Sequence, residues 1–170
     1  MSEDKLEEPG LVSYIVDQME KKCENKQVGK TVIQKMMYFL DYEDRKNFNY
    51  KMYHYGPFSS EVATNLDKAE KNGLVEMNWV KNEGYYINTS DRNISFEEMI
   101  SESERDFIEK IIDKYGEYNA QELSIITTAF HVKKEHDDIN DEKLIELVHS
   151  LKQKHSKDRI KFLLESVDLI

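Results

Sequence analysis

The sequence predicts an α+β, mostly helical protein with a winged helix-turn-helix-like N-terminal part and a helical C-terminal half. Between residues 30 and 77, an apolar helix, an aromatic strand, a second helix and an apolar strand follow one another. Residues 74–88 can form a β-hairpin, the wing, and the spacing after residue 91 is helical throughout. We expect residues 1–90 to form the winged-helix-like domain and residues 91–170 a helical extension packed on it, as one compact unit.

Two helices open the chain. The first has an acidic lead-in at Glu7-Glu8-Pro9 and an apolar face made of Leu11, Val12, Ile15, Val16 and Met19. A break at Val28-Gly29 separates it from the second, for which Thr31 is the expected N-cap. In the second helix the residues that share an apolar face are Ile33, Met36, Met37 and Leu40.

Residues 50–55 alternate as a half-buried strand does, and we expect Gly56-Pro57 to end that strand because proline cannot donate to a ladder. Ser59 or Ser60 is the expected cap of the next helix, which carries Val62, Leu66 and Ala69 on its apolar side. Gly73 suits the left-handed position after the helix, with Leu74 as its apolar contact.

The turn at residues 81–84 predicts the hairpin, and four helices are expected after it. Their expected N-terminal signals are Ser101 with Glu104, Asn119, the segment 137–140, and Ser156. The chain ends on apolar residues that we expect to dock in the core, or else against a second subunit of a homodimer: Leu163, Leu164, Val167, Leu169 and Ile170.

Charge argues against a nucleic-acid partner. The net charge is -10, and neither half is basic: residues 1–90 hold 12 Lys/Arg and 15 Asp/Glu, and residues 91–170 hold 12 and 19. Phosphate neutralisation supplies most non-specific DNA affinity, so the acidic surface favours a basic protein partner. One cysteine, an acidic start without an apolar signal region, and no apolar run long enough for a bilayer predict a cytoplasmic protein without membrane contact.

Catalytic, cofactor and metal sites are not expected. His131 and His136 are five residues apart and do not share a helical face, and their spacing does not match a zinc motif. The lysines at 21 and 22 could lower the pKa of Cys23, but no His/Asn/Asp pattern completes a catalytic set. We therefore predict that the protein is not an enzyme.

Three motifs resemble a known family. They are Ile33-Gln34-Lys35-Met36-Met37-Tyr38-Phe39, Tyr55-Gly56-Pro57-Phe58, and Lys114-Tyr115-Gly116 followed by Ala120-Gln121-Glu122-Leu123-Ser124. Over residues 11–131 this pattern is similar to the SocA-like antitoxins (Panacea domain) and to the related YwgA-like proteins. Thr127–His131 lacks the Pro-Trp that follows in the SocA-like pattern, which favours the broader YwgA-like group. The resemblance implies protein binding, as an antitoxin that holds a toxin or as an adaptor for a protease substrate.

The sequence thus predicts a non-enzymatic, antitoxin-like or adaptor-like module that captures a protein partner. Aromatic residues are enriched at interface hot spots, although they also fill cores. The predicted partner-binding residues are Tyr53, Tyr55, Phe58, Trp79 and Tyr85.

The alternative is a winged-helix DNA-binding transcriptional regulator. Its predicted DNA-contacting residues are Asn65, Lys68, Lys71 and Lys81. The helix after Ser59 fits this role poorly, because its expected exposed positions, Asn65 among them, include more acids than bases: Glu61, Asp67 and Glu70 against Lys68 and Lys71.

Overall fold

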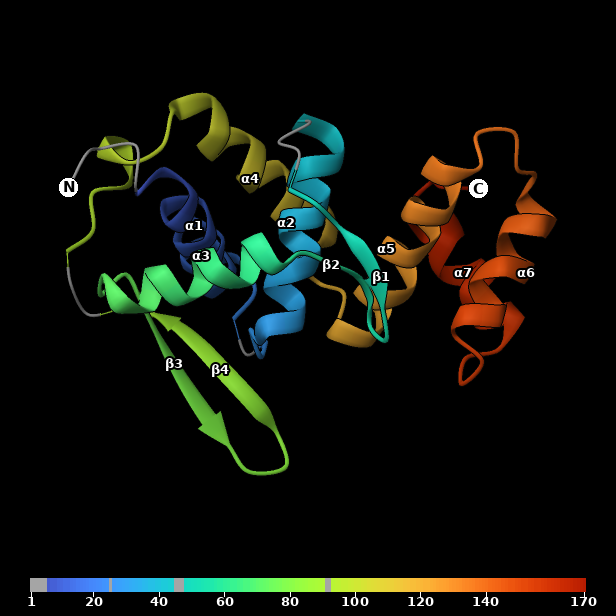
Figure 1. The fold of residues 1–170 in the computed structure, drawn as a ribbon, viewed down its shortest axis with the longest axis horizontal. Helices are drawn as coiled ribbons and strands as arrows, with labels where there is room; N and C mark the ends of the chain where they lie inside the picture. Colours follow the sequence, from blue (N-terminus) through green and yellow to red (C-terminus); the bar gives the residue numbers. More distant parts are fainter. Residues whose placement is uncertain (1–5, 25, 45–47, 91–92) are drawn as a thin grey trace.

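The computed structural model describes residues 6–24, 26–44, 48–90 and 93–170, and it is α+β and mostly helical (Figure 1). Most of the acidic start of the chain therefore lies outside the described residues. The elements are α1 (Glu7–Lys22), α2 (Lys30–Asp44), β1 (Lys51–Tyr53), β2 (Gly56–Phe58), α3 (Ser60–Lys71), β3 (Val75–Val80), β4 (Gly84–Thr89), η2 (Phe96–Glu98), α4 (Glu102–Tyr115), α5 (Ala120–Glu135), α6 (Asp141–Leu151) and α7 (Lys157–Ser166). The predicted fold class is confirmed, while the helix-turn-helix assignment stays a prediction.

The strands form two separate antiparallel hairpins. The expectation that Gly56-Pro57 ends the strand is wrong, because residues 56–58 return as β2 and pair with β1, with Pro57 opposite Met52. The reversal occurs one step earlier, at residues 54–55, and Gly56 follows it with φ 94, a conformation that side chains disfavour. The predicted hairpin β3–β4 is confirmed. Its strands pair from Val75 opposite Thr89 to Val80 opposite Gly84, and it projects from the helical body (Figure 1).

One hydrophobic core runs from α1 to α7. Helix α1 packs against α3 and α4, and α2 packs against α4, α5 and β2. At the centre, the rings of Phe39 and Tyr115 stack with centroids 3.7 Å apart, and Phe130 meets Phe39 edge to ring at 5.5 Å. Helix α2 is thereby joined to both α4 and α5.

Most predicted helix ends are confirmed. Ser59, Ser101, Asn119 and Ser156 each accept from a backbone N–H of the first turn of the following helix. After α3, Gly73 has φ 71. The backbone N–H groups of Gly73 and Leu74 donate to the helix carbonyls two and three residues before the cap, so the helix ends in a Schellman motif. Thr31 as a cap is wrong, because α2 begins at Lys30 and the carbonyl of Gly29 accepts its first bond.

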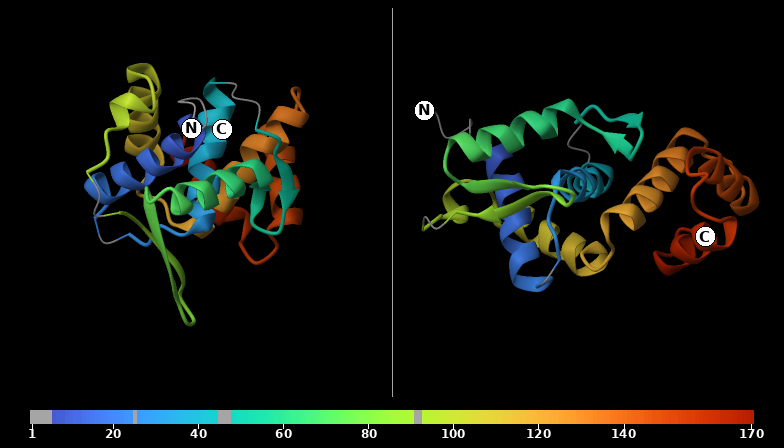
Figure 2. Two further views of the ribbon diagram at one scale, coloured as in Figure 1. Left: turned by 60° about the vertical axis from the view of Figure 1, so that its left-hand side comes forward. Right: turned by 90° about the horizontal axis from the view of Figure 1, so that it is seen from below.

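The apolar end of the chain packs in the core, as expected. Leu163, Leu164 and Val167 are buried, and the Lys133 ammonium donates to the Leu169 carbonyl at 2.9 Å. Figure 2 shows α6 and α7 at the end of the molecule remote from α1, where they pack on α5. Helix α5 therefore connects the two ends of the protein.

Candidate functional site

Two neighbouring side chains of α2 hold the segment that follows β1. The Gln34 amide exchanges two hydrogen bonds with the backbone of Ser59, donating to its carbonyl at 2.9 Å and accepting from its N–H at 3.0 Å. Lys35 donates to the Pro57 carbonyl at 2.8 Å. Both side chains are buried, so these bonds fix β2 and the start of α3 on α2.

Helix α5 and the residue after α6 hold the same segment from its other side. Ser124 donates through its hydroxyl to the Tyr55 carbonyl at 2.6 Å. The Lys152 ammonium donates to the His54 carbonyl at 3.0 Å and to the Ser124 hydroxyl at 2.7 Å. We call Gln34, Lys35, Ser124 and Lys152 the turn clamp.

Gly56 allows the turn to approach α5 closely. A Cβ at this position would lie 2.8 Å from the Thr128 hydroxyl and 3.1 Å from the Ser124 carbonyl. Contacts below about 3 Å are not sustained by a Cβ. The glycine of the Tyr-Gly-Pro motif is therefore favoured here for two reasons: its φ is positive, and the close packing on α5 leaves no room for a Cβ.

Burial dominates the electrostatics of the clamp. Burial, with the nearby charge of Lys152, lowers the pKa of Lys35 to about 7, and burial lowers the pKa of Lys152 as well. Ser124 and Lys152 are the residue types of a serine nucleophile and its base. However, the Ser124 hydroxyl donates to a backbone carbonyl and accepts from Lys152, so the pair positions the turn.

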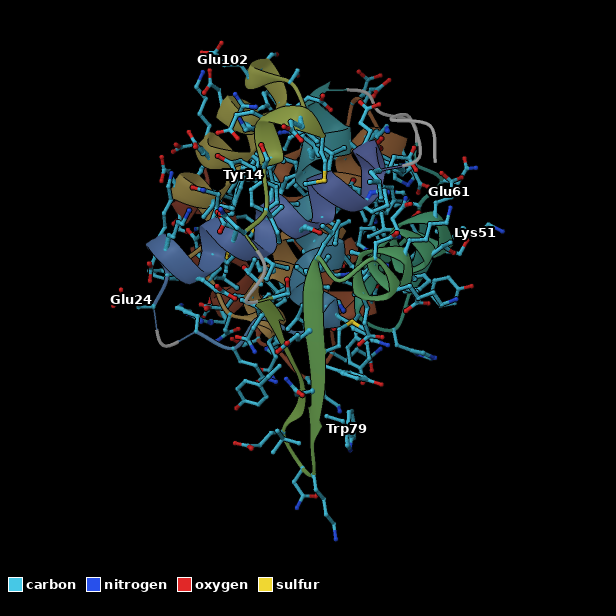
Figure 3. The ribbon with its side chains drawn as sticks, turned by 90° about the vertical axis from the view of Figure 1, so that its left-hand side faces the viewer. Tyr14, Glu24, Lys51, Glu61, Trp79 and Glu102 are labelled. Carbon is cyan, nitrogen blue, oxygen red and sulfur yellow. The ribbon has the colours of Figure 1, made fainter. Side chains whose placement is uncertain are left out.

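Three aromatic side chains of the two hairpins are exposed to solvent. Tyr53 is 58% exposed, Tyr55 70% and Trp79 66%. Phe58 and Tyr85 are half-buried, and their rings support Tyr53 and Trp79 at centroid distances of 5.3 and 5.0 Å. Figure 3 shows Trp79 on the projecting hairpin, away from the helical body.

Two adjoining hollows lie beside these aromatic residues. The first, of about 620 Å³, is bordered by the α1–α2 loop, hairpin β3–β4 and the turn before α5, and Trp79 and Tyr85 line it. The second, of about 690 Å³, lies between the Tyr55 turn, the start of α5 and residues 150–155. Thr31, Tyr55, Ala120 and Gln121 line both, so we treat the two hollows as one feature, the groove.

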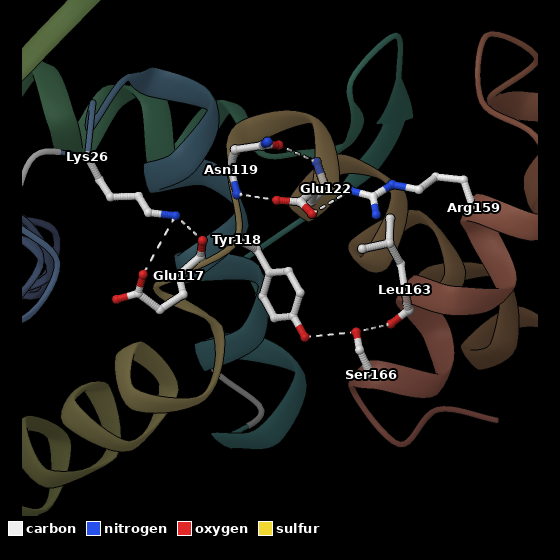
Figure 4. Close-up of polar contacts among 8 residues, drawn as sticks. All are labelled: Lys26, Glu117, Tyr118, Asn119, Glu122, Arg159, Leu163 and Ser166. Carbon is white, nitrogen blue, oxygen red and sulfur yellow. Dashed lines mark hydrogen bonds and ion pairs between the residues drawn. The ribbon is translucent and has the colours of Figure 1, made fainter.

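The turn between α4 and α5 forms part of the groove lining and is tied down on both sides (Figure 4). Lys26 donates to the Glu117 carbonyl and lies 3.8 Å from its carboxylate. On the opposite side, the Tyr118 hydroxyl meets Ser166 of α7 at 2.8 Å, and Glu122 pairs with Arg159 at 2.7 Å. This side of the groove is held against both the N-terminal helices and α7.

Of the four residues predicted to contact DNA, one is buried and three are exposed. Asn65 is only 3% exposed, and its amide donates to the Glu8 carboxylate at 2.8 Å. Its expected exposure is wrong because α3 packs against α1 along that side. Lys68 and Lys71 on α3 and Lys81 in the hairpin turn are exposed.

Cys23 is buried, and burial, with the nearby Glu117 carboxylate, raises the pKa of its thiol. The lowering that Lys21 and Lys22 could have caused is not seen, since burial and Glu117 outweigh it; these lysines pair with Asp17 and Asp113, at 3.0 and 2.9 Å. Within the described residues, no group of three or more His, Cys, Asp or Glu side chains could hold a metal ion.

Sequence reasoning missed the clamp, although three of its members lie in the quoted motifs. Gln34, Lys35 and Ser124 belong to the segments that carry the family resemblance. Lys152 has no such signal, since it lies 98 positions from the His54 carbonyl that it contacts. Only the docking of α6 on α5 brings it to the turn.

The fold and the site define a small α+β domain that presents a clamped aromatic turn beside an open groove. A family model described as "Antitoxin SocA-like, Panacea domain" matches residues 33–133, more than half of the chain. The chain belongs to this family of SocA-like antitoxins, which is one of the two groups that the motifs resemble, although the missing Pro-Trp had favoured the other. A comparison with curated proteins finds no match. Family membership suggests a protein-interaction role and points away from an enzyme.

Among the described helices, none combines the length and apolar character needed to span a bilayer.

Proposed function

We propose that the protein is an antitoxin-like or adaptor-like module that captures a protein partner, such as a toxin or a protease substrate, in the groove. The exposure of Tyr55 and Trp79 beside an open groove is the observation that carries this proposal. The family description names antitoxins, which suggests a protein partner such as a toxin. The partner would be held without chemical change, by contact with a surface that the clamp keeps in place.

The aromatic side chains suit this role energetically. Exposed Trp and Tyr rings offer large apolar area with few rotatable bonds, and side chains of this kind dominate many interfaces. Tyr85 supports Trp79 from the neighbouring strand, and the Lys30 ammonium lies 4.2 Å from the Tyr85 ring centroid. Trp79 is therefore partly ordered before binding, which reduces the entropy that association would cost.

The test is affinity capture with the wild-type chain and Trp79→Ala as parallel baits, followed by titration calorimetry with the captured protein. Removing an anchor of this kind is expected to weaken binding by about 2 kcal/mol or more. Phe162→Ala is the matched control, because Phe162 is also an exposed aromatic residue, at 61%, but lies on α7 outside the groove lining. A partner that binds wild type and Trp79→Ala equally would refute the groove as its site.

The winged-helix DNA-binding regulator is the second candidate. The projecting hairpin with Lys81 in its turn favours it, since a wing can reach the phosphate backbone. An electrophoretic shift at low and high salt separates the two functions. Tight binding with a steep salt dependence, reduced by Lys81→Ala, would support DNA contact. Unchanged migration of DNA at low salt would remove this candidate.

A further inference from the structure

We propose that the groove takes an acidic segment of the partner, in an extended form whose carboxylates alternate with apolar side chains. This inference rests on the proposed function, because it names the chemistry of the segment that the groove would hold. It is carried by three observations: the charge of the groove lining, the presence of exposed apolar residues in both hollows and where they meet, and the availability of two lysines.

The charge of the groove is opposite to that of the whole protein. The chain has a net charge of -10. Among the described residues that line the two hollows, the lysines are Lys26, Lys30, Lys152 and Lys154, and Glu83 is the one acid. His54 and His155 also line the second hollow. The groove is therefore a local basic strip, and it would attract carboxylates although the overall charge predicts a basic partner.

Exposed apolar side chains mark both parts of the groove and their junction. Trp79, 66% exposed, lines the first hollow, and Leu151, 50% exposed, lines the second. Tyr55, 70% exposed, lies where the two meet. In an extended peptide successive side chains point to opposite sides, so a segment with alternating apolar and acidic residues would contact both these anchors and the lysines that line the same hollows.

Two of the four lysines are available to a ligand. Lys26 is already paired with Glu117, and Lys152 is used by the turn clamp. Lys30 and Lys154 are exposed, one in each hollow. Lys30 lies over the Tyr85 ring, which orders its ammonium beside Trp79. These two lysines are expected to select for acidic residues, while the apolar anchors supply most of the affinity.

The experiment is selection of random 12-residue peptides displayed on phage against the immobilised full chain. Enriched peptides are expected to be rich in Asp and Glu, with Leu, Phe, Tyr or Trp between them. Each selected peptide is then labelled, and its Kd is measured by fluorescence anisotropy. The double variant Lys30→Glu/Lys154→Glu should raise the Kd about tenfold or more. The control Lys68→Glu/Lys110→Glu changes the net charge equally at exposed helical sites outside the groove, so it should stay within about twofold.

Each other outcome has a defined meaning. Neutral or basic peptides that lose affinity in Trp79→Ala would overturn the acidic segment and leave the proposed function standing. Acidic peptides that bind both double variants equally would overturn the role of Lys30 and Lys154. An absence of enrichment would overturn capture of an extended segment altogether. Sedimentation showing a dimer that Trp79→Ala dissociates would make a second copy of the chain the occupant, and would also overturn the inference.

Discussion

Gly56 and Gly84 form a matched pair of substitution sites, because their φ values are alike and their surroundings differ. Their φ values are 94 and 93, in a region that side chains disfavour, so alanine is expected to be strained at both, by about 1–2 kcal/mol. A Cβ on Gly56 would also lie 2.8 Å from the Thr128 hydroxyl and 3.1 Å from the Ser124 carbonyl. A Cβ on Gly84 would meet only a side-chain nitrogen, that of Gln27, at an ordinary 3.8 Å.

Gly56→Ala should therefore destabilise the protein more than Gly84→Ala does. Besides the strain, it must push the turn away from α5, which breaks the hydrogen bond from Ser124 to the Tyr55 carbonyl and others in the clamp. We expect the free energy of unfolding to fall by about 3–4 kcal/mol in Gly56→Ala and by about 1–2 kcal/mol in Gly84→Ala. Urea unfolding followed by circular dichroism measures both, provided the m-values agree. Equal losses in the two variants would show that close packing on α5 does not hold the turn.

Further predictions concern the clamp, α3 and the anchor. Between the folded-state pKa of Lys35, about 7, and the ordinary lysine pKa of 10.5, the unfolded chain binds more protons, so stability should rise with pH. From pH 7 to 9 the rise should be roughly 2 kcal/mol larger in wild type than in Lys35→Met; equal slopes in urea unfolding would refute this. Ser124→Ala and Asn65→Ala should each lower the free energy of unfolding by about 1–2 kcal/mol in the same assay, because each removes one partner of a hydrogen bond. Unfolding midpoints equal to that of the wild type would contradict a stabilising role for these two bonds. Trp79→Ala should change stability by less than about 0.5 kcal/mol in thermal unfolding, and a larger loss would give Trp79 a structural role.

Local signals in the sequence were sufficient for most helix ends and for hairpin β3–β4, although not for the start of α2. Caps such as Ser101 and Asn119 act within three residues, and Gly73 acts on the turn beside it, so their chemistry is visible without tertiary structure. Strand β2 was missed because Gly56-Pro57 reads as a turn in isolation. Its pairing with β1 depends on the clamp, which holds the segment from α2 and α5.

The site was predicted less completely, because it depends on contacts between distant residues. The aromatic residues of the turn and hairpin could be proposed from composition, but which of them are exposed depends on how α5 packs behind the turn. Asn65 illustrates the reverse case. It lies at a polar position of α3, and only the packing of that helix against α1 buries it beside Glu8.

The groove also extends beyond the segment that the family model matches. The matched residues, 33–133, contain the aromatic turn, the hairpin and most of α5. Leu151, Lys152 and Lys154 lie outside it, yet they line the second hollow, and Lys152 joins the clamp. The C-terminal helices therefore do two things: they help to hold Tyr55 in place, and they supply one end of the proposed binding surface. Partner preference in this chain is accordingly expected to depend on residues that membership of the family does not specify.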